Sequence, residues 1–357
     1  MEKRLALYPM TCDTCAMVRY QSLLQGYKLT QLLVSGSMRL DGRDVSYMDG
    51  GKPTGAILSD YSKDKLKDVD TLFLEYDDKL SDLTLYQEVI NDAKMMGIEV
   101  VMSRLLFQNI KESPDCWPQE TPLAITENMS RLYEIHIPVI TIFSQGVNTD
   151  QFAVELGLRK CFTEAGYKVS QIGSREISQF FNFPSIPDFM YEHRSAYEKV
   201  LRFNQYVREL TENEKSELLI IGVPGAVMKF NDRILEGLGL LPFLVSNAVK
   251  SDLSIMCMYY SVHDKNFFEE MSRYGQYRLD APIDFFSMSN TTLVPDAVVE
   301  GAKLKYIRLD SEFVLQGIQN VMEGGVYKLF NSLDDNSVQN ACIAVQETLS
   351  NNIRYMR

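Results

Sequence analysis

The sequence has little of what several function classes require. Lysine and arginine number 36 against 48 aspartate and glutamate residues, so the 357-residue chain carries a net charge of −12. Binding to nucleic acid or to an anionic membrane needs a basic face, and this balance argues against both. No apolar stretch reaches the roughly 18 residues of a membrane span, and the N-terminus lacks the apolar run of a signal peptide. We therefore expect a cytoplasmic protein.

Histidine and cysteine are also scarce. His136, His193 and His263 are far apart in the sequence, and no two of them have the spacing of helical metal ligands. We therefore expect no metal site. Six cysteines in a chain of this length do not make a disulfide scaffold. Apolar residues make up 45% of the chain, which supplies a sizeable core.

Short apolar runs alternate with helical patterns along the chain, which is typical of parallel sheets covered by helices. The fold class we expect is α/β, with two three-layer domains over residues 1–130 and 131–357, and the proline-rich stretch 111–124 is interpreted as a linker. The expected strands are Leu5–Met10, Lys28–Val34, Gly55–Ser59, Thr71–Tyr76, Ile98–Ser103, Pro138–Ser144, Lys168–Gly173, Glu217–Val223, Asp252–Tyr259 and Lys303–Leu309. The main expected helices are Cys15–Gln25, Leu85–Gly97, Asp150–Gly166, Tyr191–Leu210 and 335–357.

The segment after Pro138–Ser144 has the outline of a phosphate-binding loop (P-loop) without its charge. In the long form of that loop, Ser144 takes the place of the first glycine and Asp150 that of the second. Gln151 replaces the lysine that meets the phosphates, and Phe152 replaces the metal-binding hydroxyl. A carboxylate at Asp150 would repel a triphosphate and cap the helix itself. The alternative is an ordinary strand–helix turn.

Three other residues complete the candidates in this loop. Gly146 and Thr149 keep a chemistry that suits phosphate, and Asn148 lies between them. We expect no cofactor here beyond weak binding of a nucleotide or another anion.

The strand Glu217–Val223 ends in a second candidate segment. Gly222, Pro224 and Gly225 would let the backbone approach a ligand closely, and they would equally make a plain tight turn. No acidic residue ends this strand, which further weakens the prediction of metal–nucleotide chemistry.

Cys12 and Cys15 form a C-x-x-C motif that opens the first helix. A helix N-terminus lowers the pKa of a thiol, so the pair is a redox candidate. Asp13 between them works against this, and chance spacing is the alternative.

Several segments together form a recognisable pattern: LALYPM (5–10), MVRYQSLL (17–24), LDGRDVSYMDG (40–50), the region 138–175, IIGVPGAVMKFND (220–232) and AVKSDLSIMCMYY (248–260). They resemble a peptide maturation system protein family, which occurs beside radical-SAM enzymes and small cysteine-rich precursor peptides. The resemblance implies an accessory or scaffold protein that binds the precursor peptide, the radical-SAM maturation enzyme or a carrier protein, with no catalysis of its own.

The second half also distantly resembles proteins with a Rossmann-like N-terminal domain and a P-loop-like domain similar to dethiobiotin synthetase. Some of these are described as amino-acid N-acetyltransferases. This resemblance implies the same two domain types here, and it leaves open an atypical ATP-dependent ligase or N-acyltransferase. Thiol chemistry at Cys12 and Cys15 is a further alternative. The C-terminal helix 335–357 would dock on its own domain or mediate self-association.

Overall fold

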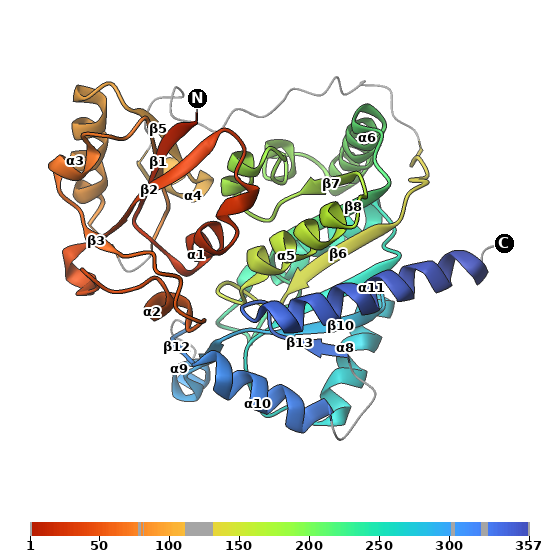
Figure 1. Cartoon of the computed structure of the whole chain (residues 1–357). Coiled ribbons are helices and arrows are strands. Elements are labelled where there is room, and N and C mark those ends of the chain that lie inside the picture. Colours follow the sequence, from red (N-terminus) through yellow and green to blue (C-terminus); the bar gives the residue numbers. More distant parts are fainter. Residues whose placement is uncertain are drawn as a thin grey trace. The chain divides into compact units, whose positions relative to one another are not determined.

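The computed structural model describes residues 2–77, 80, 82–110, 131–300, 304–322 and 328–355. The chain divides into two compact units, each described here by itself (Figure 1). Unit 1 comprises Met1–Glu120 and Arg175–Ser185, and unit 2 comprises Thr121–Ser174 and Ile186–Arg357. The expected linker 111–124 lies outside the described residues. The sequence did not predict that the segment 175–185 belongs to unit 1.

Unit 1 is built on a five-stranded parallel sheet with the strand order β3-β2-β1-β4-β5. The chain starts in the middle of the sheet and extends it first to one side and then to the other, as in Rossmann-like folds. Its strands are β1 (Lys3–Tyr8), β2 (Tyr27–Val34), β3 (Ser59–Asp60), β4 (Thr71–Leu74) and β5 (Glu99–Met102). Its helices are α1 (Cys12–Arg19), α2 (Ser46–Asp49), α3 (Leu83–Met95) and α4 (Arg104–Ile110).

The segment 175–185 contributes aromatic side chains to unit 1. It forms a short 3-10 helix, Glu176–Phe181. The ring of Phe180 is buried, and its centroid lies 5.0 Å from that of Tyr27 and 5.6 Å from that of Phe73. Edge-to-face ring contacts of this kind add to the free energy gained by apolar burial.

Unit 2 contains a six-stranded parallel sheet with the order β13-β10-β9-β6-β8-β7, together with an antiparallel ribbon of β11 and β12. The strands are β6 (Val139–Ser144), β7 (Val169–Ile172), β8 (Leu218–Ala226), β9 (Leu253–Met258), β10 (Ile283–Met288), β11 (Thr291–Leu293), β12 (Tyr306–Arg308) and β13 (Lys328–Phe330). The helices are α5 (Gln151–Glu164), α6 (Ala196–Glu214), α7 (Leu240–Ala248), α8 (Lys265–Arg278), α9 (Pro295–Glu300), α10 (Ser311–Met322) and α11 (Asp335–Tyr355).

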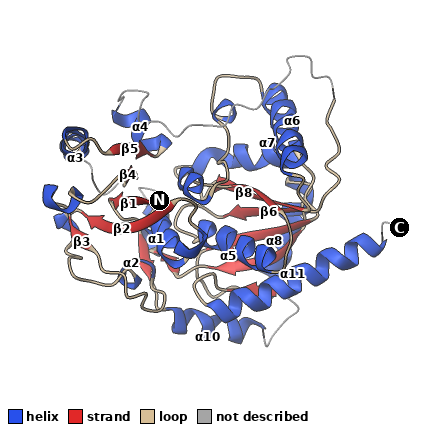
Figure 2. Cartoon of the chain, turned by 45° about the horizontal axis from the view of Figure 1, so that its top comes forward, coloured by secondary structure: helices blue, strands red, loops and turns tan. Residues whose placement is uncertain are grey.

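Helices cover both faces of the six-stranded sheet. Because successive side chains of a strand point to opposite faces, β6 divides its apolar residues between two cores. Ile140 and Ile142 pack with α5 and α11, which lie side by side (Figures 1 and 2). Val139 and Phe143 pack with α6, α7, α8 and α10. The expected α/β class with mainly parallel sheets is therefore confirmed.

Some elements differ from the expectation. The strands β10 and β13 were not expected, and the last of these is only three residues long, too short to show a periodic pattern. The predicted strand Lys303–Leu309 is β12, and it pairs in the antiparallel ribbon rather than in the main sheet. The first helix begins at Cys12 and ends at Arg19, not at Gln25.

The C-terminal helix docks on its own unit. Val338, Cys342, Val345 and Leu349 of α11 are buried in one core with the apolar face of α5. The side chain of Ile353, expected on the same face, lies outside the described residues. Among the helices that the structure describes, none has the length and apolar character to cross a membrane.

Candidate functional site

The loop Gln145–Asp150 occupies the place of a phosphate-binding loop. It follows β6, an inner strand of the sheet, and leads directly into α5. The carboxyl ends of parallel strands meet at one edge of the sheet, and ligands of open α/β folds bind there. A bound phosphate at this position would need backbone and side-chain donors directed at it.

Gln151, at the position of the usual lysine, is committed to the protein backbone. Its side-chain nitrogen Nε2 donates to the carbonyl oxygens of Ile142 and Val223, each at 2.9 Å. The side chain is buried. The amide therefore ties the ends of β6 and β8 together where a P-loop lysine would project a positive charge.

Asp150 does not cap α5 with its side chain, contrary to the expectation. Its backbone is left-handed, with φ of 56°, and its carboxylate makes no cap hydrogen bond. One oxygen accepts a hydrogen bond of 3.0 Å from Arg308, and the other accepts one of 3.0 Å from the backbone N–H of Asn290. The guanidinium supplies a charge-assisted hydrogen bond that the backbone of α5 cannot offer, and this favours the distant partners over a cap.

Tyr259, from the end of β9, fills the space over the loop. Its hydroxyl donates to the carbonyl oxygen of Val147 at 2.7 Å, and its backbone N–H donates to the side chain of Gln145 at 2.9 Å. A Cβ atom on Gly146 would lie 2.5 Å from the Tyr259 hydroxyl, so the glycine is needed for the tyrosine to approach.

Two hydroxyl groups at the ends of the loop also donate to protein carbonyls. The Thr149 hydroxyl donates to the carbonyl of Gly146 at 3.1 Å, and that of Ser144 donates to the carbonyl of Gly225 at 3.0 Å. Asn148 has a left-handed backbone with φ of 60°. The structure thus brings the predicted loop residues together and uses their hydroxyl groups internally.

A buried amide network lies behind the loop. The side-chain amide of Asn290 donates to the hydroxyl of Ser311 at 2.7 Å and accepts from Asn331 at 2.8 Å. Asn331 also donates to the carbonyl of Met288, the last residue of β10. Sequence reasoning did not single out Tyr259, Asn290, Arg308 or Asn331. Tyr259, Asn290 and Asn331 each follow an apolar run in the sequence, and this pattern could have indicated them. No local pattern indicates Arg308.

Gly222 makes room for a buried carboxylate. A Cβ atom at this position would lie 2.1 Å from an oxygen of Glu155, a fully buried residue of α5. The other Glu155 oxygen accepts a hydrogen bond of 3.1 Å from the backbone of Ser174. The close approach that Gly222 permits is therefore taken by a side chain of the same unit.

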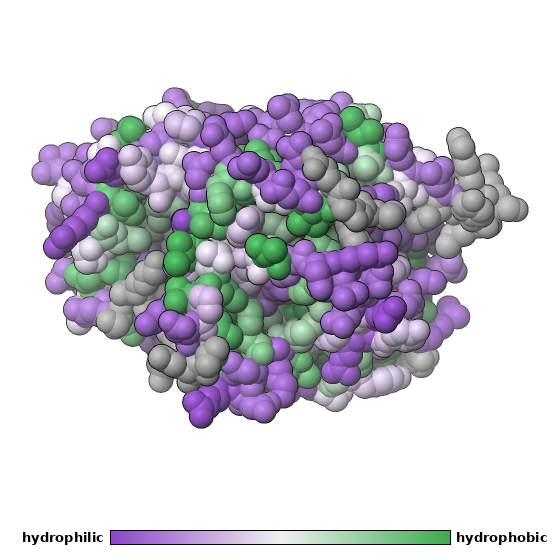
Figure 3. Space-filling model, turned by 90° about the horizontal axis from the view of Figure 1, so that it is seen from below, coloured by the Kyte–Doolittle hydropathy of each residue, from purple (hydrophilic) through white to green (hydrophobic). Residues whose placement is uncertain are grey.

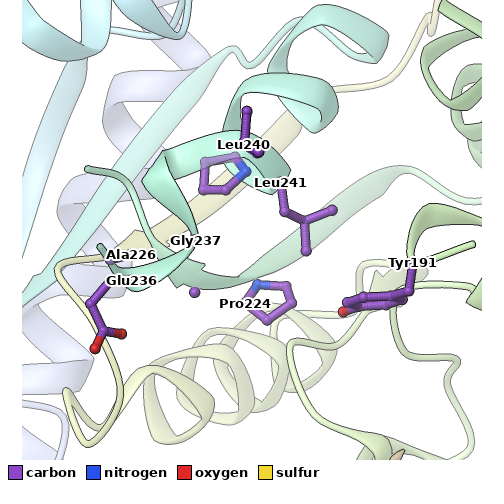
Figure 4. Close-up of a pocket in the computed structure, with 9 residues that line it drawn as sticks. Tyr191, Pro224, Ala226, Glu236, Gly237, Leu240 and Leu241 are labelled. Atoms are coloured by element: carbon purple, nitrogen blue, oxygen red, sulfur yellow. The ribbon is translucent and has the colours of Figure 1, made fainter. Parts of the chain in front are cut away.

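Pro224 and Gly225 line a pocket of about 220 Å³ at the end of β8 (Figure 4). Gly225 has φ of +86°, a conformation that favours glycine. The pocket walls are mainly apolar. They are formed by Tyr191, Pro224, Gly225, Ala226, Glu236, Gly237, Leu240, Leu241 and Pro242.

In unit 1, the thiols of the C-x-x-C motif face backbone carbonyls. Cys12 donates to the carbonyl of Met48 at 3.5 Å, and the buried Cys15 donates to that of Thr11 at 3.1 Å. Thr11 and Thr14 cap the helix reciprocally. The motif is thus at a helix N-terminus, as expected.

Charged side chains gather at the carboxyl edge of the unit 1 sheet. Arg175 pairs with Asp13 at 2.8 Å, and Arg104 lies 3.6 Å from Glu176. Glu75 follows β4 beside them. Burial, followed by repulsion from Glu176, raises the pKa of the Glu75 carboxyl to about 7. Among the residues described, no three His, Cys, Asp or Glu side chains are grouped so that they could hold a metal ion.

No protein-family model matches the chain, and no curated protein matches it. Its fold is similar to that of a DUF1611 family protein from Anabaena variabilis, with a TM-score of 0.57 and 10% identity over 96% of this chain and 100% of that one. A pseudomurein peptide ligase type C from Methanothermus fervidus has a TM-score of 0.25, with 10% identity over 80% of this chain and 44% of the ligase. HypB from Helicobacter pylori, in complex with nickel, has a TM-score of 0.31, with 15% identity over 60% of this chain and 88% of HypB.

The first of these similarities extends over both units and supports a two-domain α/β fold with mainly parallel sheets. At 10% identity it shows the fold alone, and the TM-scores of the other two carry no argument. None of the three neighbours is a peptide maturation protein by its description.

Proposed function

We propose that this chain is a cytoplasmic binding protein without catalytic activity of its own, an accessory or scaffold in the maturation of a ribosomally made peptide. It would hold the precursor peptide, the radical-SAM maturation enzyme or a carrier protein. The proposed lack of catalytic activity rests on the two hydrogen bonds that Gln151 donates to the carbonyls of Ile142 and Val223. The peptide-maturation role rests on the sequence resemblance.

Nucleotide chemistry at this edge would require several changes at once. Gln151 supplies no positive charge, and the Arg308 charge is already paired with Asp150. The Tyr259 ring lies where a phosphate would approach Gly146. Rearranging the loop would leave the carbonyls of the buried residues Ile142 and Val223 without these hydrogen bonds, at a cost of about 1–3 kcal/mol for each.

The binding role gains support from the surface beside the filled loop. The pocket at the end of β8 is apolar and adjoins Gly225, whose carbonyl is held by Ser144. A rigid, internally satisfied loop next to an apolar pocket suits recognition more than turnover, because it holds the pocket in one conformation.

The first experiment measures nucleotide binding and hydrolysis by the purified full-length protein. We expect no saturable binding of ATP or GTP at micromolar concentration, and no hydrolysis above the buffer rate. ATP hydrolysis that is lost in a Gln151→Ala variant would overturn the proposal and favour the ligase or N-acyltransferase alternative.

The second experiment tests the partner. A reduced, cysteine-rich precursor peptide is mixed with the protein and analysed by size-exclusion chromatography, and we expect the two to elute together. A Cys12→Ser, Cys15→Ser double variant should bind the peptide equally well. If the double variant abolished maturation while peptide binding was retained, the thiol-redox alternative would replace the scaffold proposal.

A further inference from the structure

The pocket at the end of β8 has two chemically different ends. Glu236 lies at one end and Tyr191 at the other, with Pro224 and Leu241 between them (Figure 4). Among the described residues that line the pocket, Glu236 alone has a charged side chain. A volume of about 220 Å³ suits one large side chain and is small for a nucleotide.

The rim of this pocket exposes several large apolar side chains. Leu235, Leu238 and Leu240 are 46%, 48% and 58% exposed, and Tyr191 is 44% exposed. Figure 3 shows apolar side chains among polar ones on one face of the molecule, and apolar side chains that reach the surface singly need no explanation. Here three leucines fall within six residues and adjoin a pocket, which is typical of an interaction site.

The backbone of this rim is strained. Glu236, Gly237, Leu238 and Gly239 have φ values of 43°, 70°, 56° and 68° in succession. Two of them are not glycine, and each such residue costs about 1 kcal/mol or more in this region. A Cβ on Gly239 would meet the carbonyl oxygen of Val227 at 2.0 Å, so this turn depends on glycine. Strain of this kind is concentrated at functional sites.

The Glu236 carboxylate is half-buried, and burial raises its pKa. In the described part of the chain, burial alone perturbs this carboxylate, and no neighbouring charge or hydrogen-bond donor offsets it. A cationic group of a ligand placed at this end of the pocket would compensate for the lost hydration of the carboxylate.

We propose that this pocket binds a peptide segment in which a large apolar residue is adjacent to a basic one. The apolar side chain lies between Pro224, Leu241 and Tyr191, and the basic group contacts Glu236. The leucines of the rim extend the contact along the peptide, which favours a peptide over a small molecule. This inference rests on the proposed peptide-binding function and names the residue pair that is recognised.

The test uses three synthetic peptides with a common glycine–serine background. Their central pairs are Leu-Lys, Leu-Glu and Ser-Lys, and binding to the full-length protein is titrated by ligand-observed NMR. We expect Leu-Lys to bind about tenfold more tightly than Leu-Glu, as one charge-assisted contact permits, and Ser-Lys to bind most weakly.

Single substitutions separate the contribution of the charged contact from that of the apolar contact. Glu236→Gln should remove the preference for Leu-Lys over Leu-Glu and keep that for leucine over serine. Tyr191→Ala should weaken both leucine peptides alike. The matched controls are Glu270→Gln and Tyr277→Ala, which change the same residue types at exposed positions of α8 and should alter nothing.

Each failure is distinguishable from a failure of the proposed function. If the precursor peptide elutes with the protein but the pocket variants bind all peptides like the wild type, the pocket assignment is wrong and the binding function stands. If neither the synthetic peptides nor the precursor bind, both are wrong. If the protein hydrolyses ATP while the Glu236 effect holds, only the non-catalytic assignment fails.

Discussion

Arg308 donates a hydrogen bond of 3.0 Å to the carboxylate of Asp150, although 158 residues separate them in the sequence. The two side chains are 18% and 4% exposed, so the pair is largely withdrawn from water. It joins the start of α5 to the antiparallel ribbon of β11 and β12. At the edge where a P-loop domain would receive an anion, the protein places its own carboxylate and pairs it.

The Asp150→Ala variant should be destabilised by about 2–4 kcal/mol, because it leaves the Arg308 charge buried without this partner. The measurement is the free energy of unfolding from urea titration. The control is Glu212→Ala, which breaks the exposed Arg208–Glu212 pair of α6 and should cost less than about 1 kcal/mol. Equal losses in the two variants would contradict the structural role of Asp150.

Replacement of Gln151 by leucine should destabilise unit 2 by about 2–4 kcal/mol. The variant leaves the carbonyls of Ile142 and Val223 without these donors in a buried site. Gln171 of β7 provides a matched control, since its buried amide atoms have no hydrogen-bond partner in the described structure. Gln171→Leu should therefore be neutral or stabilising. Similar losses for both glutamines would show that the bridging role is wrong.

Gly222→Ala should destabilise unit 2 strongly, by about 2 kcal/mol or more, since the new Cβ collides with the Glu155 carboxylate. In a Gly222→Ala, Glu155→Ala double variant the collision is absent. Its loss of stability should be smaller than the sum of the two single losses. Thermal unfolding of the four proteins measures this coupling, and strict additivity would exclude a direct contact.

Glu75 should make the stability of unit 1 depend on pH. Its folded pKa of about 7 lies above the ordinary value of 4.5 for a glutamate, because of burial first and then repulsion from Glu176, with a smaller contribution from Asp13 that Arg175 opposes. The folded unit therefore loses stability as pH rises from about 4.5 to 7, and the full cost is present above pH 7. Glu75→Gln removes this cost.

Hydrogen exchange of the β4 amides follows unit 1 separately from unit 2. Glu75→Gln should protect these amides relative to the wild type by up to about 3 kcal/mol at pH 8, with the difference vanishing near pH 4.5. Glu88→Gln, at an exposed position of α3, serves as the control. A stabilisation by Glu75→Gln that does not change with pH would exclude titration as its cause.

The alternation of elements was predictable because its signal is local. Apolar runs such as 139–144 and 218–223 are bounded by turn residues, and the stripe of α5 repeats with helical spacing. The same applies to α11, whose docking follows from its apolar face. The position of the loop between β6 and α5, and its lack of lysine, could also be inferred from the order of residues alone.

The filling of that loop could not be inferred in this way. It depends on Tyr259 and Arg308, which approach the loop only when the strand order β9-β6-β8 and the ribbon are formed. Likewise, the Asp150 carboxylate could either cap α5 locally or pair with the distant Arg308, and the sequence alone does not show which contact forms. The pocket needs Tyr191 and the turn after Leu235 to meet at the end of β8.

The sequence by itself determined the class of fold, two α/β units with mainly parallel sheets, because hydrophobic periodicity and turn residues act over a few positions. It also determined that the P-loop position lacks a catalytic cation. Only the tertiary structure decided that the segment 175–185 belongs to unit 1, that Gln151 joins two strands and that the open pocket lies at Pro224. These depend on contacts between residues far apart in the chain, whose energies local patterns do not encode.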